Sequence, residues 1–153
     1  MSTQDTKTVA TAHCRVAARG DGALLEAFAL RYRVFAHEQN VTPEIELDDE
    51  DRTAAHCVAE MDGRVVGTLR ILDRPGYTKI GRVAVDAAWR KHGIGQQIME
   101  FAHAVIRERH APQVVLHAQT AVRRFYERLG YTVCGEEFLE DGIAHIEMRK
   151  RLD

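Results

Sequence analysis

The spacing of apolar residues along the chain predicts an alternation of strands and helices. Short runs rich in β-branched residues and bounded by turn residues are typical of strands, whereas apolar residues three or four positions apart indicate a helix. On this basis strands are expected over residues 13–19, 54–61, 65–72, 79–85, 113–118, 131–136 and 143–149. Helices are expected over residues 24–35, from about Gly93 to shortly before Pro112, and over residues 122–129.

Turn residues support these boundaries. Asp62-Gly63 and Asp141-Gly142 are strong hairpin signals, and each stands between two neighbouring predicted strands. Residues 41–51 contain a proline and many carboxylates, so we expect a loop there, with room for a short helical turn.

The order β-α-loop-β-β-β-α-β-α-β-β predicts an α/β fold. Hairpins make neighbouring strands antiparallel, and a strand–helix–strand crossover around the longest helix adds a parallel pair. We therefore expect a mixed, mostly antiparallel sheet of six to seven strands, flanked by helices. Because 153 residues support one core, residues 13–153 are expected to form a single domain after a polar arm at residues 1–12.

Composition narrows the class of protein. Hydrophobic residues make up 45% and charged residues 29%, as in ordinary globular proteins, and the net charge of -2 argues against a nucleic-acid partner. The polar N-terminus lacks the apolar stretch of a signal peptide, and no apolar run is long enough to span a bilayer. We therefore expect a cytoplasmic protein without a membrane partner. Cys14, Cys57 and Cys134 stand far apart, which predicts reduced thiols and no metal site.

The stretch from Gly81 to Gly95 carries the clearest chemical signal. A strand ends at Val85, a short basic loop follows, and two glycines open the longest helix. Free N–H groups at a helix N-terminus attract a pyrophosphate, and Arg90 and its basic neighbours add positive charge. A plain strand–helix turn has the same spacing. The pattern lacks the Gly-Lys-Ser/Thr end of a P-loop and the third glycine of a dinucleotide fingerprint.

Two motifs resemble those of the GNAT superfamily of N-acetyltransferases. Arg90-x-x-Gly93-x-Gly95 matches the acetyl-CoA motif Q/R-x-x-G-x-G/A of that superfamily. The second motif is similar to N-x-x-A-x-x-F/L-Y-x-x-x-G-F/Y, and it reads Gln119-x-x-Val122-x-x-Phe125-Tyr126-x-x-x-Gly130-Tyr131. The resemblance covers nearly the whole chain, from the first predicted strand to the last.

Further patterns look like the ElaA-type branch of that superfamily. They are Arg31-x-Arg33-Val34-Phe35-x-x-Glu38-Gln39, Glu46-x-Asp48-x-x-Asp51 and Phe138-Leu139-Glu140-Asp141-Gly142-Ile143-x-His145-x-x-Met148. Because the branch is itself defined mainly by sequence, this likeness sharpens the expected fold more than the expected substrate.

The resemblance implies an enzyme that uses acetyl-CoA as its co-substrate. Backbone groups of Val83, Ala84 and Val85 would pair with the pantetheine arm like an added strand, and Val85 N–H would polarise the thioester carbonyl. Tyr126 would protonate the departing thiolate. The remaining cofactor contacts would come from the loop backbone and one side chain, at Arg90, Lys91, His92, Gly93, Ile94, Gly95 and Gln119.

The base that removes the amine proton is expected in the carboxylate-rich loop. Some members of the superfamily place a Glu on the strand before the CoA motif, where this chain has Lys79. Glu46 is the first candidate because it belongs to the branch-like Glu46-x-Asp48 pattern, in a loop that would attract a cationic amine. Glu38, Asp48 and His117 stay open as alternatives.

The expected activity is transfer of an acetyl group from acetyl-CoA to a primary amine of a small molecule or peptide, by direct attack. Three alternatives stay open: a non-catalytic acyl-CoA-binding sensor or interaction module on the same fold, an enzyme that uses another acyl group, and a nucleotide-binding α/β protein. The sequence identifies neither the acceptor amine nor whether a homodimer forms.

Overall fold

The computed structural model describes residues 10–153, apart from the side chains of residues 44 and 45. The first nine residues of the predicted polar arm lie outside the described residues. The strands are β1 (His13–Ala17), β2 (Ala55–Met61), β3 (Arg64–Arg74), β4 (Tyr77–Val85), β5 (Gln113–Gln119), β6 (Thr132–Glu140) and β7 (Ile143–Arg151). The α-helices are α1 (Gly22–Arg31), α2 (Pro43–Glu46), α3 (Ile94–Arg109) and α4 (Arg123–Arg128).

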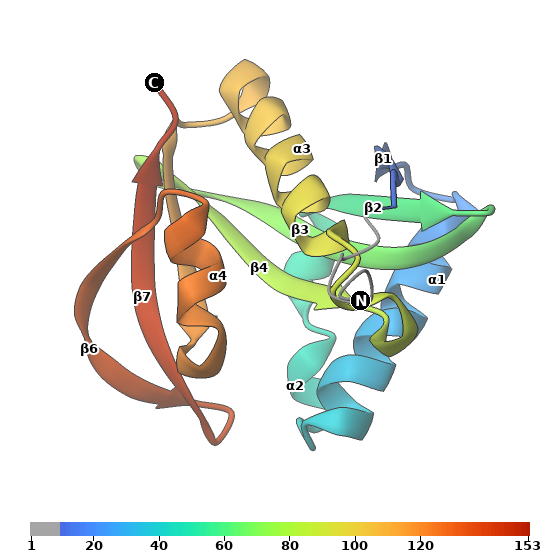
Figure 1. Cartoon of the computed structure of the whole chain (residues 1–153), viewed down its shortest axis with the longest axis horizontal. Coiled ribbons are helices and arrows are strands. Elements are labelled where there is room, and N and C mark those ends of the chain that lie inside the picture. The colour runs from blue at the N-terminus through green and yellow to red at the C-terminus, as the bar shows by residue number, and fades with distance from the viewer. Residues whose placement is uncertain (1–9) are drawn as a thin grey trace, which may run out of the picture.

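All seven strands form one sheet, in the order β1-β2-β3-β4-β5-β7-β6 (Figure 1). Each neighbouring pair is antiparallel except β4 and β5, which are parallel and are joined by the crossover helix α3. The predicted fold class, a mixed and mostly antiparallel sheet flanked by helices, is confirmed.

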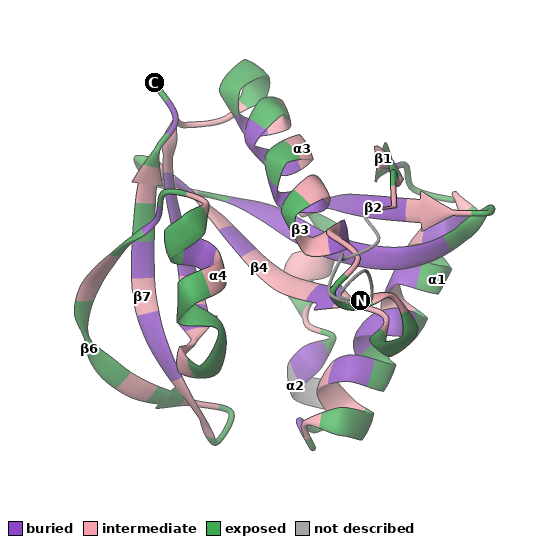
Figure 2. Cartoon of the chain, in the orientation of Figure 1, coloured by how far each residue is buried: buried purple, intermediate pink, exposed green. Residues whose placement is uncertain are grey.

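Helices cover both faces of the sheet. The apolar stripe of α3, which includes Ile98, Ala102 and Ile106, packs with Leu69 and Ile71 of β3 in the larger core cluster. On the other face α1 contributes its own stripe to a smaller cluster, whose members are Ala17, Ala23, Ala27, Leu30, Val34, Val58, Val65 and Ala84. The central strands β2 and β3 are consequently the most buried part of the sheet (Figure 2).

Two predicted elements differ from the structure in form. The first predicted helix ends as an α-helix at Arg31 and continues as a π-helix over Tyr32–Glu38. π-helical turns are frequent at functional sites, and this one reaches the cleft described below. The predicted loop at residues 41–51 contains two short helical turns, α2 and the 3-10 helix Asp49–Arg52.

The last hairpin is longer than predicted. β6 continues to Glu140 across a register shift between Cys134 and Phe138, where Gly135 has a left-handed φ of 89°. A bulge that needs one left-handed residue explains why the strand continues beyond the predicted end at residue 136. The extension carries Glu140 to the tip of the hairpin.

Candidate functional site

A cleft opens where β4 and β5 part. The two strands pair only from Thr78 to Ile80 on β4 and from Val114 to Leu116 on β5, and beyond these residues they diverge (Figure 1). The cleft has a volume of about 380 Å³. It is lined by both strands, by residues of the π-helix and the loop after it, by α4, and by the tip of the β6–β7 hairpin. The splayed sheet thus provides a slot between elements that are far apart in the sequence.

A β-bulge at Arg82 shapes the edge of β4 that faces this cleft. The register between β3 and β4 shifts here, and Arg82 has a left-handed φ of 54°. Such a conformation is costly for a non-glycine residue, and costly backbone conformations cluster at functional sites. After the bulge Val83, Ala84 and Val85 line the cleft, and among the described residues none of them pairs with β5. The strand edge expected to bind pantetheine therefore borders the cleft.

The loop before α3 has the backbone geometry of an anion site. Lys91 and Gly93, on either side of His92, have left-handed φ values of 67° and 83°. Left-handed residues within such a loop can turn successive N–H groups toward one point, where they form a concave site for an anion. Because α3 begins at Ile94, the N–H groups of its first turn have no acceptor inside the helix. Ile94 itself is buried in the core, with 1% of the residue exposed.

Gly95 has a packing role that the sequence did not reveal. A Cβ atom on Gly95 would lie 3.1 Å from Cζ of Phe125 and 3.8 Å from Cγ2 of Val85. This position therefore faces the packed space between α3 and α4. Close packing against Phe125 and Val85 accounts for a glycine at this position. The backbone N–H of Gly95 stays a candidate phosphate donor.

Two predicted cofactor-binding side chains contact the segment that follows α1. The guanidinium of Arg90 donates to both carboxylate oxygens of Glu38, at 2.9 and 2.8 Å, and to the carbonyl of Val85 at 3.1 Å. The hydrogen bonds from Arg90 lower the pKa of the Glu38 carboxyl. The Gln119 amide donates to Oε1 of Gln39 at 2.9 Å. Glu38 and Gln39 are adjacent in the chain. Glu38 thus contacts Arg90 in the loop before α3, and Gln39 contacts Gln119 at the end of β5.

Tyr126 lies in the same cleft, on α4. Its side chain is buried, with 7% of the residue exposed, and its ring packs edge-to-face against Phe125 and Tyr131. Within the described part of the chain its hydroxyl has no hydrogen-bond partner. Burial raises the pKa of the phenol, so the hydroxyl keeps its proton at neutral pH. A protonated hydroxyl that lines a cleft can donate to a bound group.

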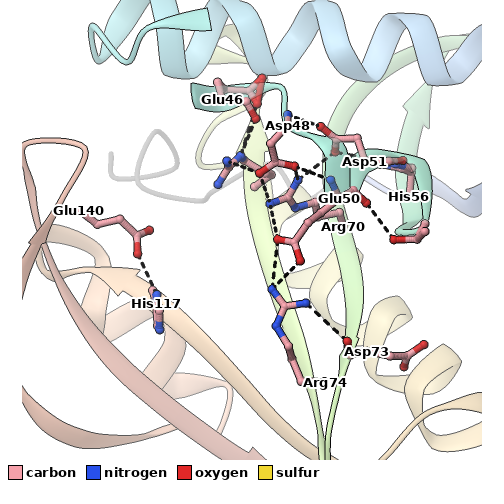
Figure 3. Close-up of polar contacts among 12 residues, drawn as sticks. Glu46, Asp48, Glu50, Asp51, His56, Arg70, Asp73, Arg74, His117 and Glu140 are labelled. Carbon is pink, nitrogen blue, oxygen red and sulfur yellow. Dashed lines mark hydrogen bonds and ion pairs between the residues drawn. The ribbon is translucent and has the colours of Figure 1, made fainter. Parts of the chain in front are cut away.

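His117 and Glu140, which both line the cleft, are joined by a hydrogen bond (Figure 3). Nδ1 of His117 on β5 lies 2.9 Å from Oε1 of Glu140 on β6. The hydrogen bond from His117 lowers the pKa of the Glu140 carboxyl, against the effect of burial. Because a carboxylate only accepts hydrogen bonds, this contact assigns a proton to Nδ1. The other ring nitrogen, Nε2, lies 3.7 Å from Oε1 of Glu147.

Glu46 lies in a buried ionic network beside the cleft, and it is not among the residues that line the cleft. Arg31 Nε donates to Glu46 Oε2 at 2.8 Å, and Arg82 Nε lies 3.5 Å from the same oxygen. Only 5% of the Glu46 side chain is exposed. The network continues through Asp48 and Asp51, which contact Arg31, Arg70 and Arg82 (Figure 3). Glu46, Asp48 and Asp51 of this loop are therefore already paired with arginines.

Arg70, Lys79, Arg82 and Glu140 also line the cleft, and the sequence analysis assigned none of them a role in the site. Glu140 had a detectable signal, since it directly precedes the Asp141-Gly142 turn at a hairpin tip. The others depend on the register between strands, which the sequence does not provide. No group of three or more potential metal ligands occurs within residues 10–153, and no helix in that range is long and apolar enough to cross a membrane.

Comparisons with known proteins agree with the architecture. The profile of the acetyltransferase (GNAT) domain matches residues 17–152. An uncharacterized N-acetyltransferase of Bacillus subtilis, YjcF, is 36% identical over 88% of this chain and 97% of its own length. ElaA of Escherichia coli is 35% identical over 80% of this chain and 84% of its own length.

Solved structures share the same fold. An acyl-CoA N-acyltransferase from Pseudomonas aeruginosa has a TM-score of 0.80 and 34% identity, with 92% of this chain and 99% of that chain covered. The crystal structure of Escherichia coli ElaA has a TM-score of 0.82 and 27% identity, with 92% and 100% covered. At 18% identity, yncA from Salmonella typhimurium, solved with its cofactor acetyl-CoA, shares the fold with a TM-score of 0.71 over 94% of this chain and 95% of that chain. This chain belongs to the GNAT acetyltransferase family.

Proposed function

We propose that this protein transfers an acetyl group from acetyl-CoA to a primary amine of a small molecule or peptide, by direct attack of the amine on the thioester. The observation that carries the proposal is that one cleft is lined by the β4 edge without a β5 partner, by Arg90 of the loop before α3, and by Tyr126. Membership of the GNAT family and the binding of acetyl-CoA by yncA support it.

The cofactor contacts follow from the backbone. Val83, Ala84 and Val85 would pair with the amide groups of pantetheine, as an added strand pairs with a sheet edge. N–H groups from Arg90 to Gly95 would hold the pyrophosphate, aided by the α3 dipole and by the Arg90 side chain. Gln119 would contact the pantetheine arm once its amide leaves Gln39. Acetyl-CoA supplies the activated acetyl group as a thioester.

Tyr126 is the proposed general acid. A thiolate leaves more readily when a nearby donor protonates it, and a phenol with a raised pKa is reliably protonated at neutral pH. The unpartnered Tyr126 hydroxyl would donate to the departing sulfur, and Val85 N–H would stabilise the negative charge that develops on the carbonyl oxygen.

His117 is a better candidate for the general base than Glu46. A base must reach the amine and must accept its proton without losing other strong contacts. Glu46 would lose its ion pairs with Arg31 and Arg82 on protonation, whereas His117 lines the cleft, and its Nε2, 3.7 Å from Glu147 Oε1, makes no hydrogen bond within the described residues. Glu140 would hold the ring in place and stabilise the imidazolium that forms.

The test is an acetyl-CoA turnover assay against a panel of primary amines. CoA thiol release that depends on both acetyl-CoA and an amine is the expected result. Acetyl-CoA binding without amine-dependent release would favour the sensor or interaction module, and faster turnover with a longer acyl-CoA would favour another acyl group. Protection against thermal unfolding by ATP or NAD, where acetyl-CoA gives none, would favour the nucleotide-binding alternative.

Three further expectations belong to the same proposal: one catalytic domain over residues 13–153, action in the cytoplasm, and three free thiols. Cys14, Cys57 and Cys134 form no disulfide with one another, and burial raises the pKa of the Cys57 thiol to about 12. A thiol with such a pKa is unreactive at neutral pH, which suits a structural role. Sedimentation velocity decides whether the protein is a monomer or the homodimer that the sequence left open.

A further inference from the structure

Lys79 lines the cleft, and no carboxylate of the described residues forms an ion pair with it. It lies on β4, is half-buried, and lines the cleft with its aliphatic strand neighbours Leu72 and Val115 beside it. Among the described residues its ammonium makes no hydrogen bond and no ion pair. Burial lowers the pKa of Lys79, while the more distant charge of Glu140 acts in the opposite direction.

A second unpaired donor lies on the same face of the sheet. Arg70 is 4% exposed, and its Nε is the buried side-chain atom that lacks a hydrogen-bond partner within the described residues. Its two terminal nitrogens are already bound by Asp48 and Asp51. Arg70 therefore retains one N–H, and Arg70 itself lines the cleft.

The register brings the two donors together. Arg70 is opposite Gly81 on β4, and Lys79 is two residues before Gly81, so both side chains project from the same face. A Cβ on Gly81 would lie 4.0 Å from Arg70 Nε, an ordinary van der Waals distance, so the unpaired N–H lies directly beside this glycine. Buried donors without acceptors are rare in folded proteins, and the buried Arg70 N–H beside the unpaired Lys79 ammonium indicates that an acceptor arrives with a ligand.

We propose that the acceptor amine carries an oxyanion group, a carboxylate or a phosphate, which binds to the Lys79 ammonium and Arg70 Nε while the amine faces His117. The inference rests on the proposed acetyl transfer and adds the chemical class of the acceptor to it. An oxyanion would supply both missing acceptors and would form charge-assisted hydrogen bonds. Nearby carboxylates do not fill this role, because Glu50 is paired with Arg74 and Glu140 with His117.

The sheet geometry limits the size of the acceptor. Lys79 is opposite Val115, and His117 is two residues further along β5. Neighbouring strands are about 4.8 Å apart and rise about 3.3 Å per residue, so the Cα atoms of Lys79 and His117 are separated by about 8 Å. The long Lys79 side chain shortens the remaining gap. An amine and an oxyanion separated by only a few bonds, as in amino acids and phosphorylated amino alcohols, would span it.

The test compares matched pairs of amines that differ only in the anionic group. Tyrosine with tyramine and lysine with cadaverine test a carboxylate, and phosphoethanolamine with ethanolamine tests a phosphate. The wild type is expected to show at least a 10-fold higher kcat/KM for the anionic member of one pair. Lys79→Met should bring that ratio close to one, mainly through a higher KM. The exposed Arg64, at the opposite end of β3 from Arg74, provides the control Arg64→Met, which should preserve the ratio.

Thermal unfolding of Lys79→Met separates binding from folding. Because the ammonium is half-buried and unpaired, its replacement by an apolar chain of similar length should keep or raise Tm, whereas a structural lysine would lower it. Transfer to amines with no preference for the anionic members would overturn this inference and leave the proposed function intact. Transfer to no amine at all would reject the proposed function. Self-acetylation of Lys79 in the intact protein, detected by mass spectrometry, would also overturn the inference.

Discussion

Arg90 and Glu38 are joined by two parallel hydrogen bonds, of 2.9 and 2.8 Å, that connect the loop before α3 to the end of the π-helix. Arg90 is the first residue of the acetyl-CoA motif, so the side chain expected beside the pyrophosphate is paired with a carboxylate in this structure. The two anions would compete for one guanidinium. Cofactor binding is therefore expected to break or reshape this ion pair.

Removal of the competing carboxylate should strengthen acetyl-CoA binding. In Glu38→Gln the amide keeps its size, releases Arg90 and removes a negative charge near the proposed pyrophosphate site. Since an exposed pair of this kind contributes about 1 kcal/mol or less, we expect up to about a 5-fold lower Kd in a calorimetric titration. Glu108→Gln, an exposed residue near the far end of α3, is the matched control and should leave Kd unchanged. An unchanged Kd in Glu38→Gln would contradict the competition.

Gly95 should be needed first for packing. Gly95→Ala places a Cβ 3.1 Å from the Phe125 ring, so the ring must shift, and overpacking of this kind typically costs about 1–3 kcal/mol. We expect a lower Tm, and a second change, Phe125→Leu, should recover much of it by making room for the methyl group. A calorimetric titration of the double variant then reports the effect on acetyl-CoA alone. Failure of Phe125→Leu to raise the Tm of Gly95→Ala would show that the clash is not the cause.

His117 and Glu46 should respond in opposite ways to substitution. His117→Asn keeps a donor for Glu140 and removes the Nε2 base, so kcat should fall by about 10²-fold or more while Tm changes little. Glu46→Gln breaks a buried ion pair, which typically costs about 3–5 kcal/mol, yet kcat per folded molecule should be largely kept. Steady-state kinetics and urea unfolding of both variants check this. A stable Glu46→Gln variant with lost kcat would return the base role to Glu46.

The buried ionic network should make the fold sensitive to acid. Burial raises the pKa of Asp51, but hydrogen bonds and positive charge from Arg31 and Arg70 outweigh it, so the pKa lies below the ordinary value of 3.8. A lowered folded-state pKa contributes stability that is fully present above about pH 4 and is lost as the pH falls through the folded-state pKa. The difference in unfolding free energy between wild type and Asp51→Asn should thus be large at pH 7 and shrink below pH 4.

The control for this pH dependence is Asp49→Asn in the same 3-10 helix. Asp49 is exposed, and no arginine of the described chain pairs with it. Its variant should differ little from wild type at any pH. Urea unfolding at pH 7, 5, 4 and 3 measures the unfolding free energy of both variants and of the wild type. If the unfolding free energies of wild type and Asp51→Asn differ by the same amount at all four pH values, the lowered pKa of Asp51 is contradicted.

The fold could be predicted from the sequence because its signals are local. The apolar stripe of α3 and the Asp62-Gly63 and Asp141-Gly142 turns fixed the element order, and the order limits the topology. The cofactor loop was also visible, because its glycines and basic residues are contiguous from Arg90 to Gly95.

The part of the cleft that is proposed to bind the acceptor amine could not be predicted from the sequence, because it depends on the register between strands that are distant in the sequence. Nothing local indicates that His117 on β5 meets Glu140 on β6, or that Arg70 stands opposite Gly81. From the sequence alone, the carboxylates after Val41 were also expected to be unpaired charges that attract an amine. The structure pairs Glu46 and Asp51 with Arg31, which a helix brings from far along the chain.

The most direct measurement follows isotopically labelled acetyl groups from acetyl-CoA to tyrosine and tyramine, with wild type and Tyr126→Phe in parallel. The wild type should produce one labelled N-acetyl product for each CoA thiol released. Tyr126→Phe should bind acetyl-CoA with the same Kd and keep its Tm, because the hydroxyl it loses has no partner among the described residues. Its transfer rate should fall by about 10²-fold, or about 2.7 kcal/mol of transition-state stabilisation. A wild type that binds acetyl-CoA but labels no amine of the panel would contradict acetyl transfer in this cleft.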